Sequence, residues 1–169
     1  MIPEPIRAGG LILRPWQPQE ADLYVDGRDD TVFEFTTESP DLDADHCARD
    51  IRRGRADPDL AQFAICDDRG RPLGSIEVRH TADGAELSYW LMPSARGRGY
   101  ARKALQAATD WARQTWGGAA LTLEIRPDNE ASIRTARAAG FVHWGTRLNS
   151  SCGGPAELYR RQIERDVSG

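Results

Sequence analysis

A glycine-rich loop between a predicted strand and a predicted helix constrains this chain more than any other feature. The mostly apolar stretch from Glu86 to Met92 ends at Pro93, the loop Arg96-Gly97-Arg98-Gly99 follows, and an alanine-rich amphipathic segment begins directly after it. A helix N-terminus carries unpaired backbone N–H groups and a partial positive charge, so it can hold a pyrophosphate. Gly97 and Gly99 let the backbone approach an anion without a Cβ in the way. The order of strand, loop and helix therefore predicts a site for a nucleotide-type cofactor.

The length and composition fit one domain that covers residues 1–169. A chain of 169 residues can bury a core without disulfides or a structural metal. No apolar run approaches the roughly 20 residues that span a bilayer, and no basic and then apolar leader opens the chain. We therefore expect a cytoplasmic protein without membrane contact. The net charge of −4 argues against a nucleic-acid partner.

The cysteines and histidines are few and scattered, so the sequence indicates neither a metal site nor a disulfide framework. They are Cys47, Cys66, Cys152, His46, His80 and His143.

The pattern of apolar residues, prolines and glycines predicts strands and helices in a mixed order. Strands are expected at residues 11–14, 61–66, 73–80, 85–92, 121–126, 141–148 and 157–163. Helices are expected from Pro18 to about Gly27, from Pro40 to about Gly54, from Ala101 to Gly117-Gly118, and from Asp128 or Asn129 to Gly140. A meander of strands followed by strand, helix, strand and helix indicates a mixed α/β or α+β sheet with helices on both faces.

Two motifs carry a resemblance to a known family. Arg96-Gly97-Arg98-Gly99-Tyr100-Ala101 resembles the Arg/Gln-x-x-Gly-x-Gly/Ala signature of the GNAT superfamily of N-acetyltransferases. Asn129-Glu130-Ala131-Ser132, followed by Ala139-Gly140-Phe141, resembles the Asn-x-x-Ser and Gly-Phe signature of its RimJ/RimL-like branch, and residues 11–16 and 157–161 look like the same branch. The resemblance implies a mixed, mostly antiparallel sheet of about seven strands, split into a V between the strand at Glu86 and the strand at Leu121.

The resemblance also implies acetyl-CoA as the co-substrate and no metal. In the family the loop amides bind the pyrophosphate, and the matching residues here are Arg96, Gly97, Arg98, Gly99, Tyr100 and Ala101. The pantetheine arm lies in the split, where it would pair with the strand edge at about Leu91 and Met92 and contact Asn129. A helix cap would explain Asn129 equally well, and Tyr100 could be a core residue.

Acetyl transfer from a thioester to an amine needs a neutral amine and a proton for the leaving thiolate. Glu86 is the first candidate for the base, since the family often carries one at the start of the splayed strand; it could also be a surface glutamate paired with an arginine. Glu124 is a second candidate, and Glu77 could pair across its hairpin. Ser132 matches a serine that the branch places near the cofactor sulfur, although it could instead bond the first turn of its helix. Where many members carry a tyrosine acid, this chain has Ala136.

These observations predict an acetyl-CoA-dependent N-acetyltransferase in which a primary amine attacks directly in a ternary complex. The amine would belong to a protein N-terminus or a small molecule. The alternative is a catalytically inactive acyl-CoA-binding module that senses or regulates. The region expected to bind the acceptor does not identify that acceptor. Its aromatic residues fit either a cleft wall or the core; they are Trp16, Tyr24, Phe33 and Phe35. Residues 149–155 are expected to form a mobile lip. GNAT-type proteins often dimerise, so a homodimer stays open.

Overall fold

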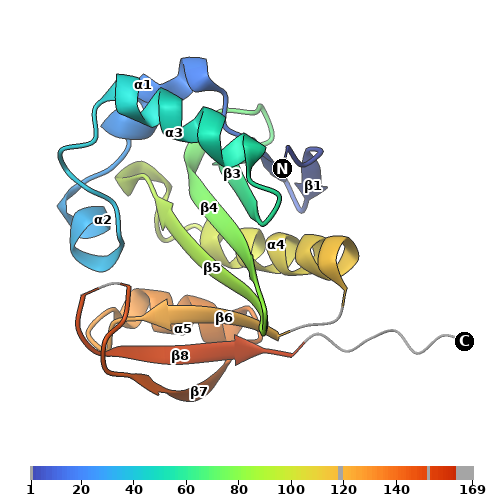
Figure 1. The fold of residues 1–169 in the computed structure, drawn as a ribbon, viewed down its shortest axis with the longest axis vertical. Helices are drawn as coiled ribbons and strands as arrows, with labels where there is room; N and C mark the ends of the chain where they lie inside the picture. The colour runs from blue at the N-terminus through green and yellow to red at the C-terminus, as the bar shows by residue number, and fades with distance from the viewer. Residues whose placement is uncertain (1, 118–119, 152, 163–169) are drawn as a thin grey trace, which may run out of the picture.

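A mixed β-sheet forms the frame of the protein, and helices lie against both of its faces (Figure 1). The computed structural model describes residues 2–117, 120–151 and 153–162. The sheet formed by these residues has 8 strands in the spatial order β1-β2-β3-β4-β5-β6-β8-β7. The strands are β1 (Ile6–Ala8), β2 (Leu11–Pro15), β3 (Leu60–Cys66), β4 (Pro72–Thr81), β5 (Gly84–Leu91), β6 (Ala120–Ile125), β7 (Val142–Arg147) and β8 (Ala156–Arg161). The helices are α1 (Ala21–Asp26), α2 (Asp30–Phe35), α3 (Ala44–Ala56), α4 (Tyr100–Trp116) and α5 (Glu130–Ala138), with 3₁₀ turns at η1 (Pro18–Glu20) and η2 (Pro93–Ala95).

Strands β5 and β6 form the V-shaped split that the family resemblance implies. They are parallel, and their pairing runs only from Gly84 opposite Ala120 to Leu87 opposite Leu123. Beyond Leu87, β5 continues beside β4 and β6 beside β8, so the two strands diverge (Figure 1). The other strand pairs in the described residues are antiparallel. The predicted fold class is confirmed, and the additional strand is β1, a short edge strand beside β2.

The apex of the split is packed backbone against backbone. A Cβ built on Gly84 would lie 2.0 Å from the carbonyl oxygen of Ala120, and the φ of Gly84 is +140°. Only glycine fits this position, because any side chain would overlap the neighbouring strand.

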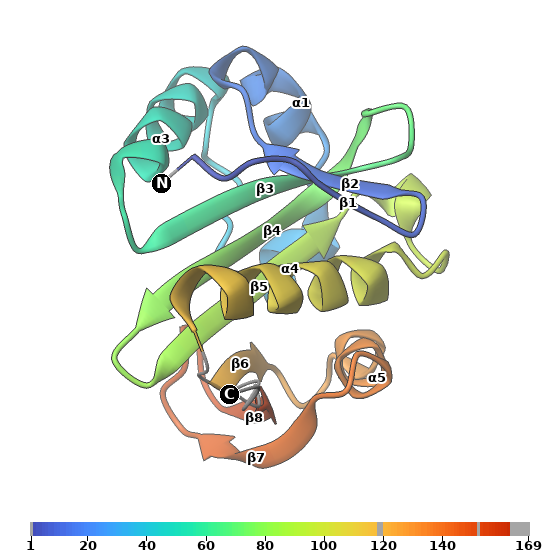
Figure 2. The ribbon, with the colours of Figure 1, turned by 90° about the vertical axis from the view of Figure 1, so that its right-hand side faces the viewer.

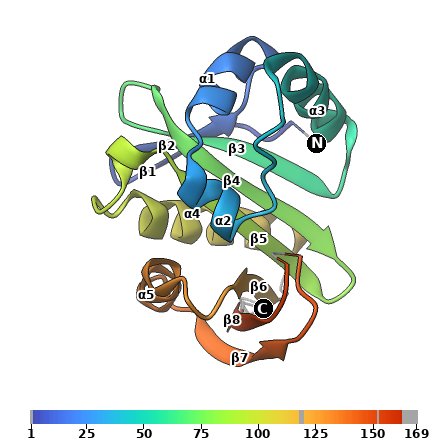
Figure 3. The ribbon, with the colours of Figure 1, turned by 90° about the vertical axis from the view of Figure 1, so that its left-hand side faces the viewer.

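Each face of the sheet buries its own core, because successive strand side chains point to opposite sides. Leu13, Phe63 and Ile65 face α4, which lies across one face of the sheet (Figure 2). Ala64 and Cys66 face α1 and α3 on the other side, where α2 also lies (Figure 3). The predicted arrangement of helices on both faces is therefore confirmed.

Helix α2 is an element that the sequence analysis does not predict. Most of its 6 residues are β-branched or aromatic, which have weak helix propensity. It forms because Asp29 caps it, accepting a hydrogen bond of 3.2 Å from the backbone N–H of Val32, while Arg96 binds the same carboxylate. A tertiary contact thus stabilises a segment that its own sequence leaves undecided.

The other predicted helices and strands are present with shifted ends. Helix α3 begins at Ala44 rather than near Pro40, because Asp43 accepts a hydrogen bond of 2.7 Å from the N–H of His46 and caps it there. Predictions that involve Gly118, Cys152 and Ile163 fall outside the described residues. None of the helices in the described ranges is long and apolar enough to cross a membrane.

Candidate active site

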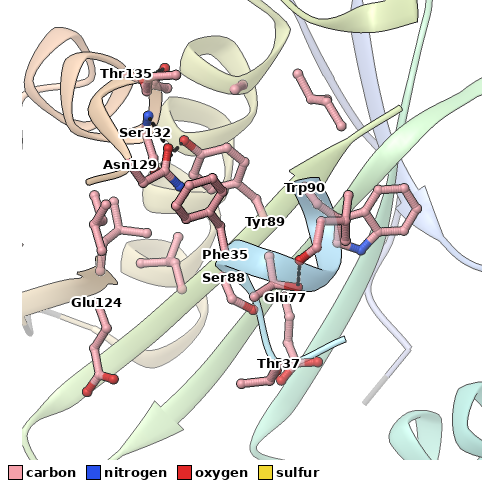
Figure 4. Close-up of a pocket in the computed structure, with 18 of the residues that line it drawn as sticks. Phe35, Thr37, Glu77, Ser88, Tyr89, Trp90, Glu124, Asn129, Ser132 and Thr135 are labelled. Carbon is pink, nitrogen blue, oxygen red and sulfur yellow. Dashed lines mark hydrogen bonds between the residues drawn. The ribbon is translucent and has the colours of Figure 1, made fainter. Parts of the chain in front are cut away.

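The split opens into a cleft of about 460 Å³ that both faces of the sheet share. The loop before α4 lies at one end, α5 lies along the split, and α2 covers β4 and β5, with its N-cap Asp29 bound to Arg96 of the loop. Polar and aromatic side chains from separate elements line the cleft, as Figure 4 shows. The labelled members are Phe35, Thr37, Glu77, Ser88, Tyr89, Trp90, Glu124, Asn129, Ser132 and Thr135.

The loop end of the cleft presents backbone rather than side chains. Gly97 and Gly99 have φ values of +71° and +78°, and a Cβ on either would meet nothing within 4 Å. Gly99 is the N-cap of α4, and no side chain caps this helix. The N–H groups of Tyr100, Ala101 and Arg102 have no acceptor among the described residues. An open, left-handed glycine loop with uncapped amides fits the pyrophosphate of a CoA-type molecule.

Arg96, predicted as a cofactor-binding residue, is held by the protein itself. Its guanidinium forms two hydrogen bonds to the Asp29 carboxylate, at 2.7 and 2.8 Å. It also donates to the carbonyl oxygen of Leu91, at 2.9 and 3.1 Å. The hydrogen bonds from Arg96 lower the pKa of the Asp29 carboxyl below its ordinary value. Arg96 therefore ties the loop to the end of β5 and to the cap of α2.

The predicted cofactor residues separate into two groups. Those that line the cleft are Leu91, Arg96, Gly97, Gly99, Ala101 and Asn129. Met92 uses its backbone inside the protein, since its N–H donates to Leu73 at 2.8 Å and its carbonyl accepts from Ala95 at 2.9 Å. Arg98 lies over the ring of Tyr100, 5.6 Å from its centroid, and Tyr100 packs against the core. Arg102, which the sequence analysis does not single out, adds an exposed cationic side chain to the lining.

Helix α5 places Ser132 beside a tyrosine of β5. The side chain of Asn129 accepts a hydrogen bond of 3.1 Å from the N–H of Ser132 and so caps α5. The hydroxyl oxygens of Ser132 and Tyr89 are 2.9 Å apart (Figure 4). Burial raises the pKa of Tyr89, so its phenol stays protonated at neutral pH. The sequence analysis gives Tyr89 no functional role. The pattern that could have indicated one is a hydroxyl-bearing side chain on the same strand face as Leu87 and Leu91.

The two carboxylates predicted as bases lie at the far side of the cleft from the loop. Glu86 is exposed, and its Oε1 lies 3.9 Å from Nη1 of Arg147. Glu124 is largely buried and accepts from Arg147 as well as from the N–H and hydroxyl of Ser151, at 3.1 and 2.9 Å. Both line the cleft.

Glu77 is a third carboxylate in the lining, opposite Ser88 in the β4–β5 register. It accepts a hydrogen bond of 3.1 Å from Gln62, and Arg79 lies 3.7 Å away. Partial burial raises the pKa of the Glu77 carboxyl above its ordinary value, although Gln62 and Arg79 act in the opposite direction. Strand alternation could have placed it, since Ser75, Glu77 and Arg79 share one face of β4.

The wall around α2 is braced by a buried arginine. The Arg28 side chain is 1% exposed and donates to Glu38 at 3.0 Å and to the carbonyl of Ser39 at 2.9 Å. Tyr24 donates to the other oxygen of Glu38 and contacts Trp90 edge to face, with ring centroids 5.1 Å apart. Among the aromatic residues predicted for this region, Phe35 lines the cleft and Trp16 is buried in the core.

The buried cysteines stand apart from this chemistry. Burial raises the pKa of the Cys47 and Cys66 thiols to about 11, so both are protonated at neutral pH. Both lie in the core beneath α3 rather than in the cleft lining.

A split mixed sheet with an open glycine loop at an uncapped helix N-terminus fits the class of CoA-dependent acyltransferases. The chain belongs to the GNAT acetyltransferase family, because the family model described as an acetyltransferase (GNAT) domain matches residues 10–142.

Solved structures with the same fold include RimJ and RimL proteins. RimJ of Mycobacterium smegmatis, in complex with CoA-disulfide, is 20% identical with a TM-score of 0.80, and covers 98% of this chain and 88% of its own. RimL, a ribosomal L7/L12 alpha-N-protein acetyltransferase in complex with coenzyme A, is 19% identical with a TM-score of 0.81, and covers 95% of this chain and 98% of its own. They support the RimJ/RimL-like resemblance at the level of the fold.

A small-molecule acetyltransferase shares the fold as well. Spermidine N-acetyltransferase from Vibrio cholerae, in complex with CoA and spermine, is 18% identical with a TM-score of 0.77, and covers 91% of this chain and 95% of its own. In sequence, an uncharacterised protein of Mycobacterium leprae is 38% identical over 74 residues, which is 43% of this chain. The match spans 20% of the length of that curated relative.

Proposed function

We propose that this protein transfers the acetyl group of acetyl-CoA to a primary amine by direct attack in a ternary complex, and that residues 1–169 act as one acetyltransferase domain. The observation that carries the proposal is the continuity of the cleft. One cavity joins an anion cradle, a hydroxyl pair and a set of carboxylates across the β5–β6 split. An anion site, a proton donor and a proton acceptor are the groups that this reaction needs.

In this proposal the loop and the split hold the co-substrate. The amides that follow Gly97 and Gly99 would bind the pyrophosphate, and Arg102 would add charge. Leu91 and Asn129 would contact the pantetheine arm along the unpaired edge of β5. When bound there, acetyl-CoA supplies an activated thioester. Arg96 would hold the loop in place rather than bind the co-substrate itself, because its guanidinium already binds Asp29 and Leu91.

Ser132 is the proposed hydrogen-bond donor to the leaving sulfur. Its hydroxyl lines the cleft at the first turn of α5, and its backbone N–H is already satisfied by Asn129. A positioned hydroxyl stabilises negative charge where it develops. This role does not require a tyrosine in α5, where the chain has the buried Ala136.

A carboxylate on the opposite side of the split would take the proton from the amine. Glu86 is the base expected from the sequence, but it is exposed and lies beside Arg147. Glu77 is a stronger candidate, because a raised pKa brings a carboxyl closer to the working pH of a general base. We therefore propose Glu77 as the base and keep Glu86 as the competing proposal.

The acceptor remains a primary amine of a protein N-terminus or of a small molecule. RimL is named for a protein α-amine and the Vibrio cholerae enzyme for spermidine. The cleft offers carboxylates to a cationic amine and an aromatic wall to its neighbour groups. We favour a small or broadly recognised acceptor.

Thiol release from acetyl-CoA across a panel of acceptors tests the proposal. The panel contains N-terminal peptides, lysine peptides, polyamines, amino acids and aminoglycosides, and calorimetry measures CoA binding in parallel. Release that depends on one acceptor class would support the proposal and name the substrate. Tight CoA binding without release for any acceptor would instead indicate a CoA-binding module.

A further inference from the structure

Tyr89 reaches the proposed donor Ser132 from a different element. It lies on β5, half-buried, and its hydroxyl oxygen is 2.9 Å from that of Ser132 on α5 (Figure 4). Both residues line the cleft where the two strands diverge. Thr135 lies on the same side of the phenol, and its own hydroxyl donates to the carbonyl of Ala131 at 2.9 Å.

We propose that Tyr89 is a positioning residue for the transfer reaction: its phenol donates to Ser132, so that the one proton of Ser132 is directed at the leaving sulfur. The proposal rests on the proposed function of the cleft. It assigns the hydrogen bond that stabilises the leaving sulfur to a pair of hydroxyls from two elements, on either side of the split.

The direction of the Tyr89–Ser132 hydrogen bond follows from the chemistry of the two hydroxyls. Each carries one proton and accepts through its lone pairs. A phenol is the stronger acid and an aliphatic hydroxyl oxygen the stronger base, so the phenol donates. Ser132 then keeps its own proton for a third group. A hydroxyl that accepts one hydrogen bond donates a stronger second one, because the bonds polarise each other.

The surroundings of Tyr89 keep it a donor over the working pH range. Its hydroxyl interacts with the neutral hydroxyls of Ser132 and Thr135, and burial raises its pKa. No proton has to leave the phenol: the C–N bond forms as the C–S bond breaks, the electron pair of the broken bond stays on sulfur, and Ser132 stabilises it by a hydrogen bond. The sulfur then takes a proton from solvent.

The pKa of the CoA thiol when bound to the protein without an acceptor tests this inference directly. The ultraviolet absorbance of the thiolate, followed against pH, reports that pKa without any turnover. For the wild type we expect a pKa below that of free CoA. In Ser132→Ala the pKa should rise by about one pH unit, as expected for one lost hydrogen bond to a charged group. In Tyr89→Phe the pKa should rise by less, because Ser132 keeps its hydroxyl but loses the bond that orients and polarises it. Acetyl-CoA affinity should stay within about twofold, because the uncharged thioester gains little from the hydroxyl.

A double-mutant cycle separates this role from a general loss of packing. Adding Tyr89→Phe to Ser132→Ala should change the thiol pKa no further, because Tyr89 acts through Ser132. Tyr159→Phe is the matched control: it removes the hydroxyl of another tyrosine, which has one hydrogen bond of 3.4 Å from Arg137 and lies outside the cleft lining.

Each remaining outcome overturns a different claim. A thiol pKa in Tyr89→Phe that equals the wild-type value, or effects that add in the double variant, would overturn the role of Tyr89 alone. A wild type that does not bind CoA would overturn the proposed function, and this inference with it.

Discussion

The two ends of the cleft are built in different ways. At the loop end, the lining comes from one short stretch of chain around the start of α4. It consists of Arg96, Gly97, Gly99, Ala101 and Arg102. At the acceptor end, side chains arrive from α2, β4, β5 and β6, and each depends on partners elsewhere. The loop end is a local structure, whereas the acceptor end exists only after the sheet and helices have assembled.

This difference indicates at which end of the cleft a single substitution should reduce binding or activity the most. A backbone cradle has no substitute for its glycines, so one side chain can fill it. An assembled wall distributes its function over several side chains, and the loss of one leaves neighbours in place. The predictions below test this contrast.

The largest effect is expected at Gly99. In Gly99→Glu, an acidic side chain would project into the open space of the cradle and repel a pyrophosphate, so acetyl-CoA binding should be lost, by more than about 100-fold. Calorimetry measures the affinity. Gly70→Glu is the matched control, since Gly70 has a similar φ of +82° and equally open surroundings but lies in the turn between β3 and β4. Equal losses in both variants would mean that backbone strain, not the cradle, explains the effect.

A smaller effect on the rate is expected at Glu77. Glu77→Gln should lower kcat/KM by about 100-fold, the usual contribution of a general base, and remove the acidic limb of its pH profile. The glutamine oxygen can still accept from Gln62, so the fold should be kept. Burial raises the pKa of this carboxyl, so its ionised form opposes folding at neutral pH, and Tm should stay the same or rise.

Glu86→Gln is the competing variant, measured under the same conditions. An unchanged pH profile in Glu77→Gln together with a lost acidic limb in Glu86→Gln would move the base to Glu86.

The smallest effect is expected at Asp29, which connects the two ends. Asp29→Asn keeps a helix cap but loses the charge that binds Arg96, so acetyl-CoA affinity should fall only about twofold to fivefold, roughly the value of a partly exposed ion pair. The control is Asp43→Asn, which changes the N-cap of α3 away from the cleft. Equal affinity in wild type and Asp29→Asn would show that Arg96 positions the loop without Asp29.

The stability of Asp29→Asn should also depend on pH with a definite sign. The hydrogen bonds from Arg96 lower the pKa of Asp29 in the folded state, so this carboxylate stabilises the fold above its ordinary pKa of 3.8. That contribution is lost as the pH falls below this value. The difference in Tm between the wild type and Asp29→Asn should therefore shrink on acidification, as thermal unfolding at a series of pH values can measure.

The sequence predicts the strand, loop and helix at the loop end because their determinants are contiguous. Gly97, Gly99 and the helix that follows them lie together in the chain, and so does Asn129 with Ser132. The fold class follows for the same reason, from strand and helix patterns in order. The short edge strand β1 is missed because 3 residues carry too little pattern.

The arrangement at the other end of the cleft cannot be predicted from the sequence, because the residues that determine it lie far apart along the chain. Helix α2 depends on the contact between Asp29 and Arg96, which are 67 positions apart. The contact of Tyr89 with Ser132 joins residues 43 positions apart across the split. The unusual surroundings of Glu77 arise from burial between strands, which no local motif announces.

The close approach of Gly84 to Ala120 fixes the point from which the two parts of the sheet, here called arms, diverge. One arm is the sheet from β1 to β5, and the other is the sheet from β6 to β8, joined by a short parallel ladder. A methyl group at Gly84 would have to push the arms apart, and the displacement would grow with distance from the apex. The width of the cleft beside Ser132 therefore depends on a backbone contact at the apex, between two residues that lie outside the cleft lining.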